Sequence, residues 1–357
     1  MKQYQDLLQN IVNNGIEKES GRPNMPNTIG ISNATITMDL NDGFPLLTTK
    51  KMYWKGIVHE LLWFLRGETN IKYLVDNKVN IWNQDAYRWY LKYHKKSNVK
   101  TPPLTIEQFV DTIKNNEIKN PHFEGSDYCL GDLGKVYGYQ WRNQNGVDQV
   151  KDVLNGLKTN PYSRYHIIDG WNKADFPEMA LPPCHLLYQF IVRPMSFKER
   201  RDLAYKYAVE NNKIPLLIDA HGDTGTPEYM RVIDETGWNI PKFYLDLNMY
   251  QRSVDTFLGC PFNLASMSLM LMIFAKASNM IAGKAFWIGG DTHLYVNHMP
   301  MVVEQLSRDP RPLPKMFITK QLYGLDDILS LSIDDFQLLG YDPHPTIKAE
   351  LFTGIKK

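Results

Sequence analysis

A run of 20 residues without a charged side chain, residues 256–275, most strongly limits how this chain can fold. It is long enough to cross a membrane as a helix, but Gly259, Pro261 and Asn263 interrupt its first half. We therefore expect a loop at this end, followed by a buried helix from Leu264 to Met280 with its methionines in the core. The chain has 357 residues, of which 43% are hydrophobic, so it can build a core around such a helix.

Length and charge narrow the class of protein. Two domains would fit the length, but we predict a single catalytic domain over 1–357, with insertions at about 89–126 and 194–241 that show no catalytic spacing. A formal net charge of +1 gives no electrostatic case for nucleic-acid binding. The three cysteines fit neither a zinc site nor a disulfide framework. The N-terminus lacks the apolar region of a signal peptide, so we expect a cytoplasmic protein, in the host cytoplasm if a phage encodes it.

Periodicity of the apolar residues predicts most of the remaining elements. Helical spacing predicts helices over 4–17, 56–65 and 105–115, and a Ser-x-x-Glu capping pattern at Ser196 opens another helix to about 210. Alternating or continuous apolar runs predict strands at 35–40, 186–192, 244–250 and 285–288. Loops are expected at 219–226 and, after two glycines, at 291–295.

One cluster of polar residues points to an active site. Cys184 stands in Leu-Pro-Pro-Cys-His just before an apolar strand, and the polar segments 250–263 and 289–295 are not what a packed core needs. Arg252 offers a permanent cation, which can stabilise a thiolate or bind a phosphate. Glu60 belongs to an apolar helix, where loss of water can raise its pKa and suit it to proton transfer.

Each of these residues also has a purely structural interpretation. A lone cysteine is more often a small buried hydrophobe than a nucleophile. Glu60 alone could be an exposed helix carboxylate, and His293 alone could be a structural histidine with satisfied hydrogen bonds. Tyr137 could simply belong to a glycine-rich turn. The combination of segments, rather than any one residue, favours the active-site interpretation.

Together these segments resemble the thymidylate synthase family, including its pyrimidine hydroxymethylase members. The resemblance spans most of the chain and is carried by the Glu60 helix, the Cys184 segment and residues 42–45, 48–50, 81–82, 131–134, 136–138, 140–142 and 341–345. It implies an α+β fold, in which a large twisted mixed sheet packs against its counterpart in a homodimer and carries helices on its other face. It also implies dUMP as substrate, 5,10-methylenetetrahydrofolate as co-substrate and no metal.

The resemblance further implies a role for each matching residue. Cys184 would attack C6 of the pyrimidine so that C5 can take one carbon from folate, while Glu60 and Tyr137 would move protons. Asn263 would pair with O4 and N3–H of uracil, which favours dUMP over dCMP. The other matches are Arg22, Arg252, Ser253 and Arg164 (acting across the dimer interface) for the phosphate, His293 and Tyr295 for the sugar, and Tyr53, Trp82, Phe352 and the catalytic Asp255 for folate.

Several positions depart from the pattern of the family. Arg22 is followed by Pro-Asn-Met-Pro rather than a loop of glycine and threonine, which should make this loop stiffer. Arg164 is followed by Tyr165 rather than a second arginine, and Tyr53 stands where many relatives have histidine. The chain ends in a polar segment, 350–357, where the family commonly has a short apolar end that folds over folate.

Two altered segments, the Arg22 loop and the C-terminal segment, decide our expectation for the product. Exclusion of water determines whether the one-carbon intermediate takes hydride to give dTMP or water to give 5-hydroxymethyl-dUMP. Because both segments that would close the folate site differ from those of the family, we expect a dUMP hydroxymethylase of the kind used in phage DNA modification. Thymidylate synthesis is the alternative, favoured by family frequency and by the retained Trp82. A non-catalytic homologue that binds nucleotide or RNA is a distant alternative.

Overall fold

A mixed β-sheet forms the centre of the molecule in this computed structural model, which describes residues 1–21, 24–97, 100–115, 128–213 and 227–352. Within these residues seven strands join in one sheet, with the order β1-β2-β7-β6-β5-β4 and with β3 also paired to β7. β6 and β7 are parallel and the other pairs are antiparallel. The strands are β1 (Ile16–Lys18), β2 (Thr28–Ile31), β3 (Ala34–Asp39), β4 (Ile167–Asp169), β5 (His185–Pro194), β6 (Phe243–Asp255) and β7 (Ile281–Tyr295), with a separate hairpin of β8 (Lys315–Ile318) and β9 (Phe336–Leu339).

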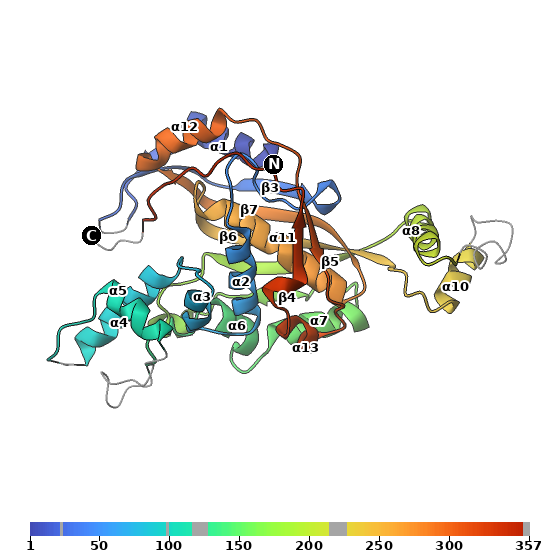
Figure 1. Ribbon diagram of the computed structural model, residues 1–357, viewed down its shortest axis with the longest axis horizontal. Helices are drawn as coiled ribbons and strands as arrows, with labels where there is room; N and C mark the ends of the chain where they lie inside the picture. Colours follow the sequence, from blue (N-terminus) through green and yellow to red (C-terminus); the bar gives the residue numbers. More distant parts are fainter. Residues whose placement is uncertain (22–23, 98–99, 116–127, 214–226, 353–357) are drawn as a thin grey trace.

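Helices cover one face of this sheet. α11 (Gly259–Ala277) packs against β6, β7 and α2 (Trp54–Leu65), and both helices cross the sheet in Figure 1. The predicted α+β class with a large mixed sheet is confirmed. The other helices are α1 (Lys2–Asn14), α3 (Lys72–Asp76), α4 (Asn83–Lys96), α5 (Ile106–Lys114), α6 (Tyr137–Asn143), α7 (Gln149–Thr159), α8 (Phe197–Glu210), α10 (Pro227–Glu235), α12 (Met299–Leu306) and α13 (Leu325–Leu329).

The start of α11 corrects our prediction of a loop at its N-terminal end. The helix begins at Gly259, so Pro261 lies in its first turn. A proline is tolerated there because the first backbone N–H groups of a helix have no partner within the helix. α11 is long and apolar enough to cross a membrane, yet 72% of its most apolar window is buried inside the protein. Burial against the sheet accounts for its composition.

β7 also differs from prediction, because it continues through the two glycines that we took for its end. A side chain at 289 would lie 2.4 Å from the ring of Trp287, and one at 290 would lie 2.7 Å from the backbone oxygen of Arg252. The glycines therefore allow close approach of neighbours and do not mark a turn. Residues 291–295 are strand, not loop, and this carries His293 to the same edge of the sheet as the end of β6.

The segment 194–241 builds a small core of its own. The predicted capping box at Ser196 is present at the start of α8, with both of its hydrogen bonds to Glu199. Buried residues of α8 and of the chain around α10 form a cluster separate from the main core, which includes Tyr229 and Trp238. Figure 1 places α8 and α10 at one end of the molecule, away from the sheet. The predicted loop 219–226 lies outside the described residues.

The first predicted insertion begins inside α4. Trp89 and Tyr90, at its start, are buried in the main hydrophobic core. Farther on, α5 confirms the helix predicted at 105–115, because Thr105 and Gln108 form its capping box. Residues 116–127, the rest of this segment, lie outside the described part of the chain.

Candidate active site

Three chain segments meet at one edge of the sheet, where β6 and β7 end and β5 begins. The register pairs His185 with Gln251, and Asp255 with His293. Because β5 runs antiparallel to β6, the residue before β5 lies beside the end of β6. This topology brings Cys184 to Arg252, as the sequence suggested.

Arg252 is fixed directly beside the Cys184 thiol. Its Nη2 lies 3.6 Å from Sγ, while Nε and Nη2 donate to the carbonyl oxygens of Pro183 (2.7 Å) and Pro182 (3.0 Å). Its backbone N–H donates to the carbonyl of Cys184 at 2.8 Å. The two prolines thus hold the guanidinium in place, where a cation favours negative charge on sulfur. Cys184 itself is half-buried and therefore open to a ligand.

Tyr137 supports the same segment from the opposite side. Its hydroxyl oxygen accepts a hydrogen bond from the backbone N–H of Cys184 at 2.8 Å. Burial raises the pKa of this phenol well above its usual value, so it remains protonated at neutral pH. Its O–H can therefore still donate to a ligand or water, which fits the expected part in proton transfer.

Glu60 has a pKa that is shifted into the neutral range. Burial raises its pKa to about 7, although a hydrogen bond from Trp82 Nε1 to its Oε1 (2.7 Å) acts in the opposite direction. A carboxyl with this pKa can both give and take a proton near neutrality. The contact joins Trp82 to the proposed proton-transfer group, across 22 positions of sequence.

Asp255 ends β6 and prepares the start of α11. One of its carboxylate oxygens, Oδ1, accepts hydrogen bonds from the backbone N–H groups of Phe257 (2.9 Å) and Leu258 (3.1 Å). The other oxygen lies 3.9 Å from Nδ1 of His298. Asp255 is therefore held by the turn that leads into α11, and its expected contact with folate stays a prediction.

The described part of the C-terminal segment, up to Phe352, packs against residues of the predicted site, and our expectation that its polar end does not bury as in the family stays a prediction. Nε2 of His298 donates to the carbonyl of Glu350 at 2.8 Å. The ring of Phe352 stacks on His298 (centroids 5.0 Å apart) and packs against Tyr295 (4.9 Å). The aromatic ring at 352 thus supplies an apolar contact to Tyr295 and His298. Residues 353–357 lie outside the described part.

The remaining predicted ligands differ in how their side chains are held. Within the described residues, the side chains of Ser253 and Asn263 make no hydrogen bond and remain available to a ligand. His293 is buried, and its Nδ1 donates to the carbonyl of Asp291 at 3.3 Å. Tyr53 is exposed, and its hydroxyl donates a long hydrogen bond of 3.4 Å to the carbonyl of Asn77. Arg22 lies outside the described residues.

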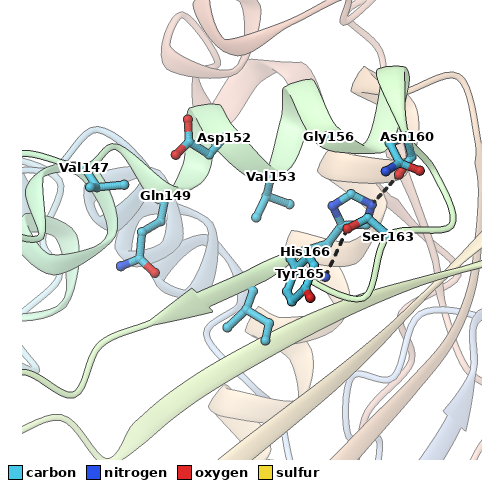
Figure 2. A pocket seen from close by; sticks show the side chains of 10 residues that line it. Val147, Gln149, Asp152, Val153, Gly156, Asn160, Ser163, Tyr165 and His166 are labelled. Atoms are coloured by element: carbon cyan, nitrogen blue, oxygen red, sulfur yellow. Dashed lines mark hydrogen bonds between the residues drawn. The ribbon is translucent and has the colours of Figure 1, made fainter.

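Arg164 lies on an exposed loop, and its neighbours Ser163 and Tyr165 line a cavity of about 450 Å³. Figure 2 shows His166 reaching from this loop under α7, where its Nε2 donates to the carbonyl of Asn160 at 3.1 Å. A side chain at Gly156 would lie 2.8 Å from the ring of His166, so α7 needs glycine there. Cys184 does not line this cavity, which belongs to the loop and not to the reaction site.

Two residues without a predicted role, Tyr188 and His185, meet beside Cys184. The hydroxyl of Tyr188 lies 2.8 Å from Nδ1 of His185, directly beside Cys184 in the chain. Three residues apart in a regular strand, the two side chains would point to opposite faces, so the pattern gave no signal of this contact.

Comparison with known proteins identifies the family. A family model described as thymidylate synthase matches residues 2–212 and 230–353. Proteins named thymidylate synthase from Mycoplasma pneumoniae, Mesoplasma florum and Mycoplasma mobile are 38%, 37% and 39% identical to this chain, each over 98% of the chain and 99% of the relative. The chain belongs to the thymidylate synthase family.

Membership of the thymidylate synthase family confirms the resemblance seen in the sequence. The protein is an enzyme of one-carbon transfer that binds dUMP and uses 5,10-methylenetetrahydrofolate as co-substrate. Among the residues that the structure describes, no group of three or more His, Cys, Asp or Glu side chains could hold a metal ion. The names of the relatives favour thymidylate synthesis, our alternative, over hydroxymethylation, our main expectation.

Proposed function

We propose that the protein is a thymidylate synthase, which converts dUMP and 5,10-methylenetetrahydrofolate into dTMP and dihydrofolate. The observation that carries this proposal is the shared name of relatives aligned over 98% of the chain. The packing of Phe352 on Tyr295 supports it, because a tail folded onto the site can exclude water from the intermediate. The argument for hydroxymethylation rested on the altered Arg22 loop and on the polar end of the chain, and residues 22–23 and 353–357 lie outside the described part.

In the proposed reaction, the Cys184 sulfur forms a bond to C6 of dUMP. The electron pair of the C5=C6 bond moves toward O4, and the resulting enolate bonds through C5 to the methylene carbon that folate supplies. Loss of the C5 proton and cleavage of the bond between the methylene carbon and the folate nitrogen leave an exocyclic methylene on C5 and release tetrahydrofolate. Hydride from tetrahydrofolate then reduces this methylene to a methyl group as the Cys184–C6 bond breaks, which gives dTMP, dihydrofolate and the free thiol. Glu60 and Tyr137, both able to carry protons at neutral pH, are the groups that we assign to the proton transfers.

Residues with free polar groups are proposed to hold the nucleotide. The side-chain amide of Asn263 can donate to O4 and accept from N3–H of uracil, and the hydroxyl of Ser253 can donate to the phosphate. Arg252 would serve the phosphate as well as the thiol, joined by Arg22 and, from the partner subunit, by Arg164. His293 and Tyr295 remain our candidates for the sugar, and Tyr53, Trp82, Asp255 and Phe352 for folate.

A homodimer through the uncovered face of the sheet belongs to the same proposal. Ile191 in β5 and Tyr250 in β6 point away from α11, and each keeps 40% of its surface exposed. Phe286 and Ile288 of β7 lie in register with this part of β6. An apolar sheet face without helices over it favours packing against a second copy. We further propose one catalytic domain, with insertions at about 89–126 and 194–241, in a cytoplasmic enzyme.

Mass spectrometry of the nucleotide formed from dUMP and methylenetetrahydrofolate tests this function, with absorbance followed for dihydrofolate. We expect dTMP and an equal amount of dihydrofolate. A 5-hydroxymethyl product without dihydrofolate would establish water capture and restore our first expectation. Binding of dUMP without turnover would instead favour the non-catalytic alternative.

A further inference from the structure

A β-bulge at the start of β5 changes which side chains share the inner face of the sheet. His185 pairs with Gln251 and Leu187 pairs with Tyr250, so Leu186 is an extra residue in β5. A bulge of this kind reverses the alternation of side chains for the residues before it. As a result, His185 and Tyr188 lie on the same face, although they are three residues apart.

The two side chains meet in a tightly packed aromatic setting. Tyr188 is 3% exposed, and its ring packs edge-on against Trp141 with centroids 5.3 Å apart. The imidazole of His185 lies against the ring of Tyr137 at 4.4 Å and against Phe64 at 5.9 Å. Both rings are therefore held in position, and the hydrogen bond of 2.8 Å between them is a fixed contact.

The surroundings decide which partner donates in this bond. Among the described residues, the Tyr188 hydroxyl has no hydrogen-bond partner except Nδ1 of His185, so its proton has no other acceptor there. Burial raises the pKa of Tyr188 far above its usual value, with the nearby charge of Glu60 adding to the effect. Burial also lowers the pKa of His185 to about 3. A neutral imidazole thus faces a protonated phenol at neutral pH.

We propose that Tyr188 is a positioning residue, whose hydroxyl donates to Nδ1 of His185 and so fixes the imidazole as the tautomer with its proton on Nε2. Within the described part of the chain, Nε2 has no hydrogen-bond partner, and His185 is only half-buried. The fixed tautomer therefore presents a hydrogen-bond donor to the site next to Cys184. It cannot accept a hydrogen bond there.

The use of this donor rests on the proposed function. Attack of Cys184 on C6 moves negative charge onto O4 of the pyrimidine, and a donor in a fixed orientation stabilises such charge more in the transition state than in the ground state. The other tautomer would place a lone pair at Nε2 and repel the same oxygen. The predicted effect of Tyr188 is thus on the chemical step and not on binding of dUMP.

The tautomer can be read directly from long-range ¹H–¹⁵N spectra of the full-length protein labelled with ¹⁵N-histidine. His185→Gln assigns the signal. We expect the wild-type spectrum to show the Nε2–H tautomer at neutral pH, and Tyr188→Phe to show the Nδ1–H tautomer or a mixture. A wild-type Nδ1–H signal overturns the proposal without any need for the variant to fold.

Kinetics then separate positioning from a merely structural contribution. Tyr188→Phe keeps the ring packed on Trp141, so we expect kcat for dTMP formation to fall about tenfold while KM for dUMP changes by less than about twofold. Tyr87→Phe is the matched control. It also removes a partly buried tyrosine hydroxyl, which donates a hydrogen bond of 2.7 Å to the Leu104 carbonyl outside the site, and it should leave both constants unchanged. An unchanged tautomer or an unchanged kcat in Tyr188→Phe overturns the proposal. If wild-type enzyme makes no dTMP, the proposed function fails, but the spectra still decide the tautomer.

Discussion

At the residue scale, the decisive contact is that of Cys184 with Arg252, whose guanidinium is held by hydrogen bonds to two proline carbonyls. A proline has no N–H, and its ring restricts the backbone, so the segment before Cys184 offers fixed acceptors. Two of these acceptors leave the guanidinium little freedom to turn away from the sulfur. The same cation can then serve the nucleophile before substrate binds and the phosphate afterwards.

Replacement of the nucleophile gives the first prediction. Cys184→Ala should lower turnover of dUMP by roughly a thousandfold or more, because no other group can form the bond to C6. Binding of dUMP, measured by calorimetry, should remain, since the phosphate ligands are intact. Cys129→Ala is the control: its half-buried sulfur makes long contacts with Asn70 (3.7 Å) and the Leu130 carbonyl (4.0 Å), and the variant should turn over normally. Normal turnover by Cys184→Ala would refute the mechanism.

The second prediction follows from the raised pKa of Glu60. A carboxyl whose pKa rises from 4.5 unfolded to about 7 folded resists ionisation in the folded state. Its contribution to stability is therefore present below pH 4.5, is lost as pH rises to about 7, and does not change above that. Glu60→Gln should remove this loss and stabilise the protein at pH 8 by about 1 to 3 kcal/mol, since one pKa unit corresponds to about 1.4 kcal/mol.

Chemical denaturation at pH 5 and pH 8 measures this change. The gain in unfolding free energy should appear at pH 8 and be small at pH 5, while kcat falls and loses its dependence on a group that titrates near pH 7. Equal effects of Glu60→Gln at both pH values would show that the carboxyl titrates normally. Such a result would leave Glu60 without the property that suits it to proton transfer.

Sequence could identify most site residues but not the contacts between some of them. Cys184 and Arg252 were predictable as neighbours, because both stand at strand ends with polar segments around them. The contact of Glu60 with Trp82 depends on how α2 packs, which periodicity does not reveal. The pair His185–Tyr188 depends on a bulge, and a single extra residue in a strand leaves no mark in the apolar pattern.

At the scale of elements, the ends of helices and strands were harder to predict than their existence. The helices α1, α2, α5 and α8 were all expected, since each has helical apolar spacing or a capping box. α11 and β7 were cut short in our prediction by Pro261 and by Gly289–Gly290. Proline in a first helical turn and glycine under a close neighbour are compatible with regular structure, and only the tertiary contacts distinguish these cases from breaks.

The third prediction concerns the C-terminal segment. Phe352→Ala should remove the ring from His298 and Tyr295 and loosen the tail, so that water reaches the intermediate more often. We expect a lower kcat for dTMP and a measurable fraction of 5-hydroxymethyl-dUMP by mass spectrometry. Leu351→Ala is the matched control, because this neighbouring side chain is 51% exposed and should matter little. If both variants behave like wild type, the tail does not control access of water.

At the scale of the whole molecule, the sheet divides the protein into a covered and an uncovered face. α11 and α2 bury the inner residues, whereas the strands β5 to β7 present apolar side chains outward with no helix over them in the described part of the chain. Arg164 and Tyr165 lie on an exposed loop next to β4, at the edge of the sheet, and Tyr165 is 89% exposed. Among the residues that the structure describes, neither side chain has a partner that would explain its position. A second copy across the uncovered face would supply one.

Mixing two inactive variants tests whether each site is shared between subunits, which is the fourth prediction. Cys184→Ala lacks the nucleophile and Arg164→Ala lacks the proposed cross-subunit cation, so each homodimer should be inactive or nearly so. After unfolding and refolding together, half of the dimers should be mixed, and each mixed dimer contains one site with both residues intact. Activity should therefore recover to about a quarter of the wild-type value per site. No recovery, with mixed dimers confirmed by native mass spectrometry, would place Arg164 in its own subunit's site and remove the reason for its exposure.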